Sequence, residues 1–256
     1  MIWAGAGTWD STGGPEYGWL YRSRDAGLSW QPVTVTFPIS SVTDVVVDPT
    51  DSDTVYAATG RRWVDSTNFG SGIVKTTDGG RSWEFANERL TPTNISRLAI
   101  NPDDPDTIHA GSNLFSFTED GGMFKSEDGG AHWKQSFPWL RISGLDMDPM
   151  VTSTAYAGSY WAGIWQTVDA GETWERVDGP LGHLSSLSLD LTVAPSRTVV
   201  YAGVNGGIFD PATARAAHEA RTRESDAEFY GSGVYQLTLD HRPPTWEVYL
   251  PLVTRD

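Results

Sequence analysis

One eight-residue pattern occurs four times and constrains the fold more than any other feature of the chain. It consists of Ser or Thr, any residue, Asp, any residue, Gly, two further residues and Trp, at 23–30, 76–83, 126–133 and 167–174. A degraded fifth copy ends at Trp246, with Asp240 near the matching place and no glycine. A pattern that returns at intervals of roughly 40–50 residues predicts similar units that stack and share one core.

Each copy has the composition of a hairpin turn. An Asp side chain accepts hydrogen bonds from the backbone N–H groups that follow it, and Gly allows the positive φ that closes the turn. The preceding hydroxyl can bond the same turn, and the Trp offers an apolar surface to a neighbouring unit. We therefore interpret the following residues as structural: Asp25, Trp30, Asp78, Trp83, Asp128, Trp133, Asp169 and Trp174.

The pattern resembles the Asp box, or bacterial neuraminidase repeat, of β-propellers in sialidases, xyloglucanases, sortilin-type receptors and a photosystem II assembly factor. The resemblance implies an all-β propeller of four-stranded antiparallel blades. It says little about activity, because one fold hosts many functions. A chain of 256 residues is long enough for one large all-β domain, which we expect to span 1–256.

Four strand signals, A to D in chain order, recur in each unit. Strand A is predicted at 42–48, 95–101, 142–148 and 184–190. Five B–C–D sets but only four A strands are present, so we expect five blades, the first without its inner strand. A closed ring is the simplest arrangement, and an arc of a larger propeller is the alternative. Segment 210–228 interrupts the pattern and is predicted to be a helical or disordered insertion.

The inner strands define columns of residues near the propeller axis. One column holds Ser41, Asn94, Arg141 and His183, and another holds Asp44, Arg97, Gly144 and Ser186. Between them lie the hydroxyls of Thr43, Ser96, Ser143 and Ser185, which we expect to bond neighbouring backbone. Arg97 and Arg141 can jointly bind a carboxylate or sulfate. The alternative is an ion pair with Asp44 or Asp146 that only lines the channel.

Long loops on the face opposite the boxes carry many aromatic side chains. Aromatic and polar groups together suit recognition of sugar rings or peptides; the alternative is that the aromatics fold back and plug the propeller. The predicted ligand-binding residues are Arg97, Arg141, Asp44, His183, Arg61, Trp63, Trp139 and Trp161. His109 aligns with the strand B aromatics Trp3, Tyr56, Tyr156 and Tyr201, and is expected to pack in the core.

Composition excludes several classes of partner and site. The 33 acidic and 18 basic residues give a net charge of −15, which repels nucleic acid and anionic lipid. There is no cysteine, so thiolate metal sites and cysteine nucleophiles are excluded. No apolar run is long enough for direct membrane insertion. We predict no cofactor and no metal; acidic turns such as 48–53 could bind Ca²⁺, but they lack the EF-hand spacing.

The resemblance leaves two classes of function open. Sialidases would imply an arginine triad and a Tyr–Glu pair, which we do not find. Xyloglucanases would imply two carboxylates across a cleft between two propellers, with Asp44 and Asp146 as the nearest candidates. We favour a non-catalytic binding or scaffold propeller, extracellular or periplasmic, that recognises a protein, peptide or glycan on the loop face. We assign no catalytic residue, and glycoside hydrolysis is the alternative.

Overall fold

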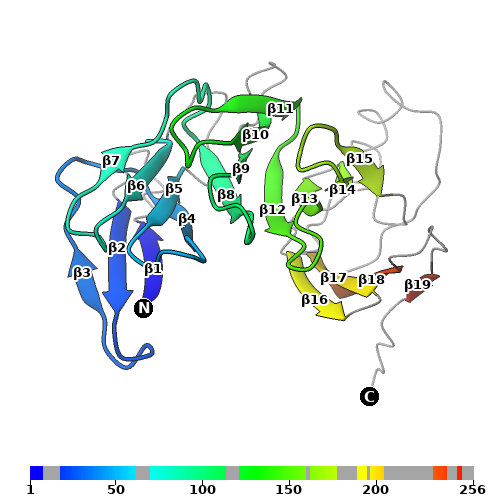
Figure 1. The fold of residues 1–256 in the computed structure, drawn as a ribbon, viewed down its shortest axis with the longest axis horizontal. Coiled ribbons are helices and arrows are strands. Elements are labelled where there is room, and N and C mark those ends of the chain that lie inside the picture. Colours follow the sequence, from blue (N-terminus) through cyan, green and yellow to red (C-terminus); the bar gives the residue numbers. More distant parts are fainter. Residues whose placement is uncertain are drawn as a thin grey trace.

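The computed structural model describes residues 1–7, 18–60, 70–113, 121–159 and 162–177, with the backbone of 189–194, 197–204, 233–240 and 247–249. All regular elements of these residues are strands, arranged in five antiparallel sheets. Figure 1 shows the sheets side by side, like blades around an axis. The all-β, blade-like architecture predicted from the sequence is therefore confirmed. The predicted insertion at 210–228 and the fifth copy at Trp246 lie outside the described residues.

The blades follow one another along the chain, each running from its inner to its outer edge. Blade one has three strands, β1 (Ile2–Gly7), β2 (Gly18–Ser23) and β3 (Gln31–Val33). Blade two has β4 (Val42–Val47), β5 (Val55–Thr59), β6 (Ile73–Thr76) and β7 (Glu84–Phe85). Blade three has β8 (Ile95–Ile100), β9 (Ile108–Ser112), β10 (Gly122–Ser126) and β11 (Lys134–Pro138).

The last two blades complete the set, and four of the five have four strands. Blade four has β12 (Ile142–Met147), β13 (Ala155–Ser159), β14 (Gly163–Thr167) and β15 (Glu175–Val177). Blade five has β16 (Leu189–Ala194), β17 (Arg197–Val204), β18 (Gly233–Asp240) and β19 (Glu247–Tyr249). β16 continues beyond residue 190, where the A strand of this blade was predicted to end. Its register places Asp190 opposite Tyr201. Asp146 holds the equivalent place opposite Tyr156, so the predicted alignment of this strand was two residues out.

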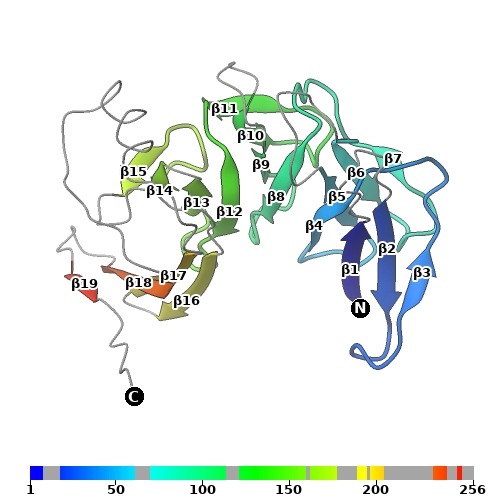
Figure 2. The same ribbon diagram turned by 180° about the vertical axis from the view of Figure 1, so that it is seen from behind.

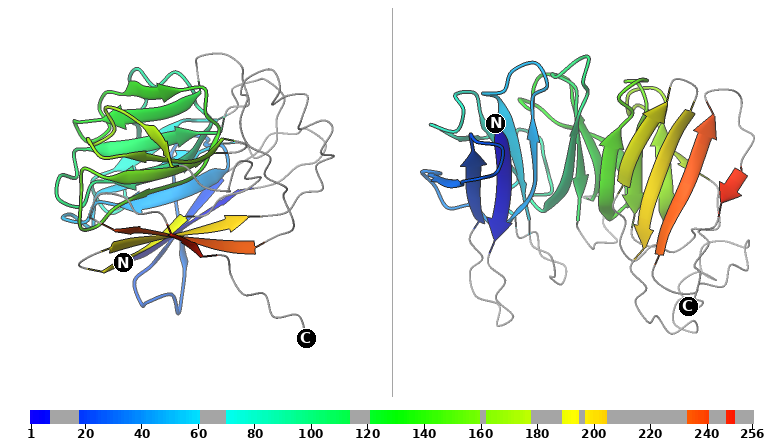
Figure 3. Two further views of the ribbon diagram at one scale, coloured as in Figure 1. Left: turned by 90° about the vertical axis from the view of Figure 1, so that its right-hand side faces the viewer. Right: turned by 90° about the horizontal axis from the view of Figure 1, so that it is seen from below.

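The blades form an open arc rather than a closed ring. Strand contacts join successive blades, β1 with β4, β4 with β8, β8 with β12 and β12 with β16. Figures 1 and 2 show blades one and five at the two separate ends of the arc, and Figure 3 shows the same from below. The closed five-bladed ring was therefore wrong, and the arc alternative describes the structure.

The end of the arc leaves β1 more exposed than its equivalents. Every residue of β5, β9 and β13 is buried, whereas β1 contains only exposed and half-buried residues. The equivalent strands lie between an inner strand and the blades on either side. Within the described residues, β1 has neither an inner strand nor a preceding blade.

The Asp boxes share one hydrogen-bond pattern. In the second box, Oδ1 of Asp78 accepts hydrogen bonds from the Ser82 N–H at 2.9 Å and the Thr76 hydroxyl at 2.8 Å. The Thr76 hydroxyl in turn accepts from the Gly80 N–H at 3.0 Å. The same bonds recur in the boxes of Asp25, Asp128 and Asp169. Each aspartate thus holds its turn together.

The second, third and fourth boxes pack on the strand B ring of the preceding blade. Trp83 makes an edge-on contact with Trp3 at 5.8 Å, and Trp174 contacts His109 at 6.1 Å. Trp83, Trp133 and Trp174 are only 7%, 3% and 6% exposed. Trp30 has no preceding blade in the described structure and is 42% exposed. The hydrophobic core therefore lies in the joints between blades.

Hydroxyl groups join the inner strands at repeated β-bulges. Thr43 Oγ1 donates to the Ile95 carbonyl at 2.6 Å, and Ser96 Oγ donates to the Ile142 carbonyl at 2.6 Å. Ser143 Oγ donates to the Gly158 carbonyl at 3.3 Å. The predicted bonding of these hydroxyls to neighbouring backbone is confirmed for these three residues, and Ser185 lies outside the described residues.

Candidate binding surfaces

Asp44 lies at the axial end of blade two and connects two inner strands. Its carboxylate accepts hydrogen bonds of 2.9 Å from the N–H groups of Val45 and Leu98. Burial raises the pKa of Asp44, and the Leu98 bond and the Arg97 guanidinium only partly oppose that rise. Arg97 also donates to the Ser96 carbonyl at 2.6 Å. Asp44 and Arg97 therefore interact across the joint of blades two and three.

Arg141 lies on the next joint along the axis. Its Nε donates to Oδ1 of Asn113, at the end of β9, at 2.6 Å. The guanidinium is thus anchored to blade three although it belongs to the connection into blade four. A shared anion site of Arg97 and Arg141 stays a prediction.

An aromatic groove lies between blades three and four. It has a volume of about 360 Å³ and is lined by Phe137, Pro138, Trp139, Leu140 and Trp165. The rings of Phe137 and Trp165 lie 4.7 Å apart at 44°, and the indole of Trp139 is 48% exposed. This groove brings predicted ligand residue Trp139 together with two aromatic side chains that the sequence analysis had not selected.

The backbone of Trp139 is left-handed, with φ of 73°. A bulky residue in this region is an outlier, because its Cβ approaches neighbouring backbone. Arg89 has φ of 63° in the matching connection of blade two, and each of the two precedes a buried leucine, Leu90 or Leu140. The turn is thus a repeated feature of the fold, whereas the Trp that occupies it in blade three is not.

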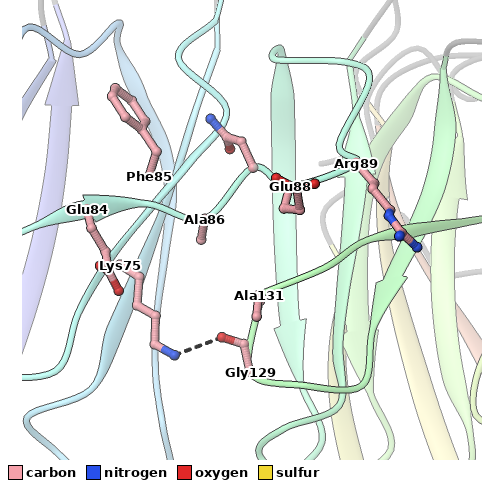
Figure 4. Close-up of a pocket in the computed structure, with 10 residues that line it drawn as sticks. Lys75, Glu84, Phe85, Ala86, Glu88, Arg89, Gly129 and Ala131 are labelled. Carbon is pink, nitrogen blue, oxygen red and sulfur yellow. Dashed lines mark hydrogen bonds between the residues drawn. The ribbon is translucent and has the colours of Figure 1, made fainter.

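A second, polar groove of about 410 Å³ lies between blades two and three (Figure 4). Lys75 points across it and donates to the Gly129 carbonyl at 2.8 Å. Glu84 and Phe85 line the blade-two side, and Glu88 lines the groove from the connection that follows β7. Because Lys75 is already engaged with the third Asp box, this groove is part of the inter-blade joint.

Four predicted ligand residues remain. Arg61, Trp63, Trp161 and His183 lie outside the described residues, so their grouping stays a prediction. Phe137 and Trp165 were not predicted as ligand residues because both fall on strands, where an aromatic residue normally indicates a core position. The run from Phe137 to Trp139 was the available signal for this groove.

The described part of the chain shows neither a cluster of metal-ligating side chains nor a membrane-spanning helix. There, no group of three or more His, Cys, Asp or Glu side chains is placed to hold a metal ion. No helix long and apolar enough to span a bilayer occurs among the same residues. The Asp48 carboxylate instead bonds the Thr50 N–H at 2.7 Å, as an Asx turn does.

Comparison with known proteins places the fold. The family described as Sortilin, neurotensin receptor 3 (Sortilin-Vps10) matches residues 18–136. An ancestral GH74 enzyme superposes with a TM-score of 0.61 at 17% identity, over 91% of this chain and 29% of that one. A GH74 enzyme of Niastella koreensis superposes with a TM-score of 0.57 at 19% identity, over 94% and 36%. The chain has the fold of an Asp-box β-propeller.

Two relatives of this Asp-box propeller are named for an enzymatic activity. An oligoxyloglucan-reducing end-specific xyloglucanase of Emericella nidulans is 34% identical over an alignment of length 151, which covers 53% of this chain and 17% of the relative. A xyloglucanase of Hypocrea jecorina is 24% identical over an alignment of length 276, gaps included, which covers 94% of this chain and 31% of the relative. The propeller thus spans less than a third of either relative. These names favour the hydrolase alternative over the non-catalytic function preferred from the sequence.

Proposed function

We propose that this Asp-box propeller is part of a glycoside hydrolase that acts on xyloglucan, and that it binds the polysaccharide in its aromatic groove. The similarity to two xyloglucanases supports the substrate class. The observation that carries the binding role is Trp139, a large ring that is half exposed on a left-handed turn. Because Arg89 adopts the same turn in blade two, the exposed tryptophan ring and not the backbone conformation distinguishes this connection.

The groove has the chemistry that a glucan chain requires. The faces of glucose rings are apolar C–H surfaces, and they pack on aromatic rings such as Trp139 and Phe137. The groove is lined by five residues with no charged side chain. Because the polysaccharide is uncharged, the net charge of −15 on the chain does not oppose its binding in the groove. A polymer of this size cannot cross a membrane, so we propose an extracellular or periplasmic location.

Hydrolysis needs a carboxyl group that holds a proton near neutral pH. Burial raises the pKa of Asp44, which is the direction that such a group requires. We therefore propose Asp44 as the first carboxyl to test for acid catalysis. Arg97 and Arg141 remain proposed ligand contacts along the axis, where hydroxyl or carboxylate groups of a ligand can accept their hydrogen bonds.

A binding titration tests the proposal. Xyloglucan oligosaccharide is titrated against the wild type, Trp139→Ala and the control Arg89→Ala, which alters the matching turn of blade two. We expect Trp139→Ala to weaken binding about tenfold or more, equivalent to about 1.4 kcal/mol, and Arg89→Ala to bind as the wild type does. Equal binding by Trp139→Ala and the wild type would overturn the groove assignment. No xyloglucan binding at all would overturn the substrate class.

Release of reducing sugar separates catalysis from binding. Wild type and Asp44→Asn are incubated with xyloglucan, and new reducing ends are counted. Hydrolysis that Asp44→Asn abolishes, with oligosaccharide affinity retained, supports an acid role for Asp44. Hydrolysis that survives in Asp44→Asn excludes that role, and binding without hydrolysis identifies a binding propeller.

A further inference from the structure

The joint between blades three and four contains a histidine where its equivalents have tryptophan or tyrosine. His109 occupies the strand B position of Trp3, Tyr56 and Tyr156, opposite Lys125 in the register. Its side chain is 0% exposed. Within the described residues, neither ring nitrogen has a hydrogen-bond partner. The core prediction for His109 is confirmed, but this ring has polar atoms that the joint does not use.

The fourth Asp box closes directly over this ring. Trp174 meets His109 edge-on at 88°, and a Cβ placed on Gly171 would collide with the imidazole. At the preceding joint, the Tyr56 hydroxyl donates a hydrogen bond to the Gly129 carbonyl at 2.9 Å. Within the described residues, the His109 ring makes no equivalent hydrogen bond to the fourth box. The His109 ring itself therefore contacts the fourth box by close packing alone, and the polar link between blade three and this box is the ion pair of Lys125 with Glu172.

The charged groups around His109 are Lys125 of β10, Glu127 of the third box and Glu172 of the fourth box. Lys125 pairs with Glu127 at 2.7 Å and with Glu172 at 2.9 Å. From β8 the ring faces uncharged Ala99, and from the fourth box it faces Gly171 and Trp174. Burial first, and Lys125 second, lower the pKa of His109 to about 4, and Glu127 opposes them.

The direction of the pH effect follows from this shift. Unfolded or exposed histidine has a pKa of about 6.5, so the exposed state binds more protons between pH 6.5 and 4. The neutral His109 ring therefore stabilises the closed joint above pH 6.5, and this stabilisation of the closed joint is lost as the pH falls toward 4. A charged imidazole relieves its desolvation when the fourth box moves away and admits water.

We propose that the joint between blades three and four is an acid-sensitive hinge, opened by protonation of His109, that controls the aromatic groove beside it. Trp174, Leu140 and Trp165 belong to one cluster, so movement of the fourth box disturbs the groove wall. The effect on glucan binding rests on the proposed function, whereas the opening of the joint does not.

Hydrogen exchange of the whole chain at pH 7 and pH 4.5, corrected for intrinsic rates, tests the hinge. Peptides of the fourth box, 167–174, are compared with peptides of the third box, 126–133. We expect the opening equilibrium of the fourth box to rise by up to about 100-fold at pH 4.5. We expect no comparable rise in the third box, which packs on Tyr56.

Matched variants isolate the histidine. His109→Phe should remove the acid response of the fourth box, whereas His132→Gln, an exposed box histidine, should keep it. An acid response retained in His109→Phe, or an equal response in both boxes, overturns the proposal. If His109→Phe does not fold, His109→Tyr gives the same comparison. An NMR titration of wild-type His109 near its ordinary pKa of about 6.5 would also overturn it.

Oligosaccharide binding at the two pH values separates this proposal from the proposed function. Loss of binding at pH 4.5 in the wild type but not in His109→Phe supports control of the groove by the hinge, and equal loss in both overturns that control. A wild type that fails to bind at pH 7 counts against the proposed function alone. Hydrogen exchange then still decides whether the hinge exists.

Discussion

The indole nitrogen of Trp133 donates a hydrogen bond of 2.9 Å to the carbonyl of Ala86, across the joint of blades two and three. The backbone N–H of Trp133 also donates to the Glu88 carbonyl at 3.0 Å. The indole nitrogens of Trp83 and Trp174 are buried without a partner in the described residues. The three box tryptophans therefore bury similar surfaces but differ in polar bonding.

This difference predicts unequal costs for one substitution. Trp133→Phe loses a buried hydrogen bond, whereas Trp83→Phe and Trp174→Phe remove an unpaired polar group. All three lose similar packing, so we expect Trp133→Phe to be less stable than the other two by about 1–2 kcal/mol. Urea unfolding of the three variants measures it, and equal losses would contradict a role for the Ala86 bond.

The glycines of the boxes test whether the joints explain the motif. Gly171 has φ of 87° and lies against His109, whereas Gly27 has φ of 90° and only Trp30 near its absent Cβ, at 3.9 Å. Gly27→Ala should cost the left-handed penalty alone, about 1–2 kcal/mol. Gly171→Ala adds a steric clash and should cost about 1–3 kcal/mol more. Thermal and urea unfolding compare them, and similar losses would show that close packing is not the reason for the glycine.

The sequence predicted the parts of this fold that depend on local chemistry. The bonds of Asp78 follow from an Asp that precedes backbone N–H groups in a turn, and the bonds of Thr43 and Ser96 follow from hydroxyls beside bulged strands. Strand number and blade order could be counted, because each box marks one hairpin. The A strand of blade five was misaligned because Asp190 ends the predicted strand pattern but not β16.

The arc and the groove depended on information that the sequence does not carry. Whether blades close into a ring depends on the packing angle at every joint, which sums over large side chains such as Trp83 and Trp133. The left-handed backbone of Trp139 has no residue signal, since Gly or Asn would normally mark it. Arg141 looked free to bind an anion, yet its partner Asn113 comes from a different blade.

The turn shared by Trp139 and Arg89 predicts an inverted order of alanine and glycine stability. At most positions glycine is less stable than alanine, but at a positive φ glycine relieves the strain. We expect Trp139→Gly to be more stable than Trp139→Ala by about 1 kcal/mol, and Arg89→Gly to exceed Arg89→Ala by a similar amount. For a domain of this size that corresponds to about 2–4 °C in Tm. The opposite order at both positions would show that the backbone is not strained.

The electrostatic effect of Arg97 on Asp44 predicts a pKa that responds to one substitution. Burial raises the pKa of Asp44 above 3.8, so the folded state binds more protons than the unfolded state. The stability that this carboxyl contributes is therefore complete below pH 3.8 and is lost as the pH rises through its folded pKa. Arg97→Ala removes a nearby positive charge and should raise the pKa of Asp44 further.

Carbon-13 NMR of the side-chain carboxyl groups measures this titration, and Asp51 is the internal control. A hydrogen bond from the Thr54 hydroxyl is the main cause that lowers the pKa of Asp51, on an exposed turn. Arg97→Ala should leave the Asp51 midpoint unchanged while the Asp44 midpoint moves up. An Asp44 midpoint below 3.8 would remove the case for Asp44 as a proton donor, and a midpoint that does not respond to Arg97→Ala would remove the electrostatic interaction with Arg97.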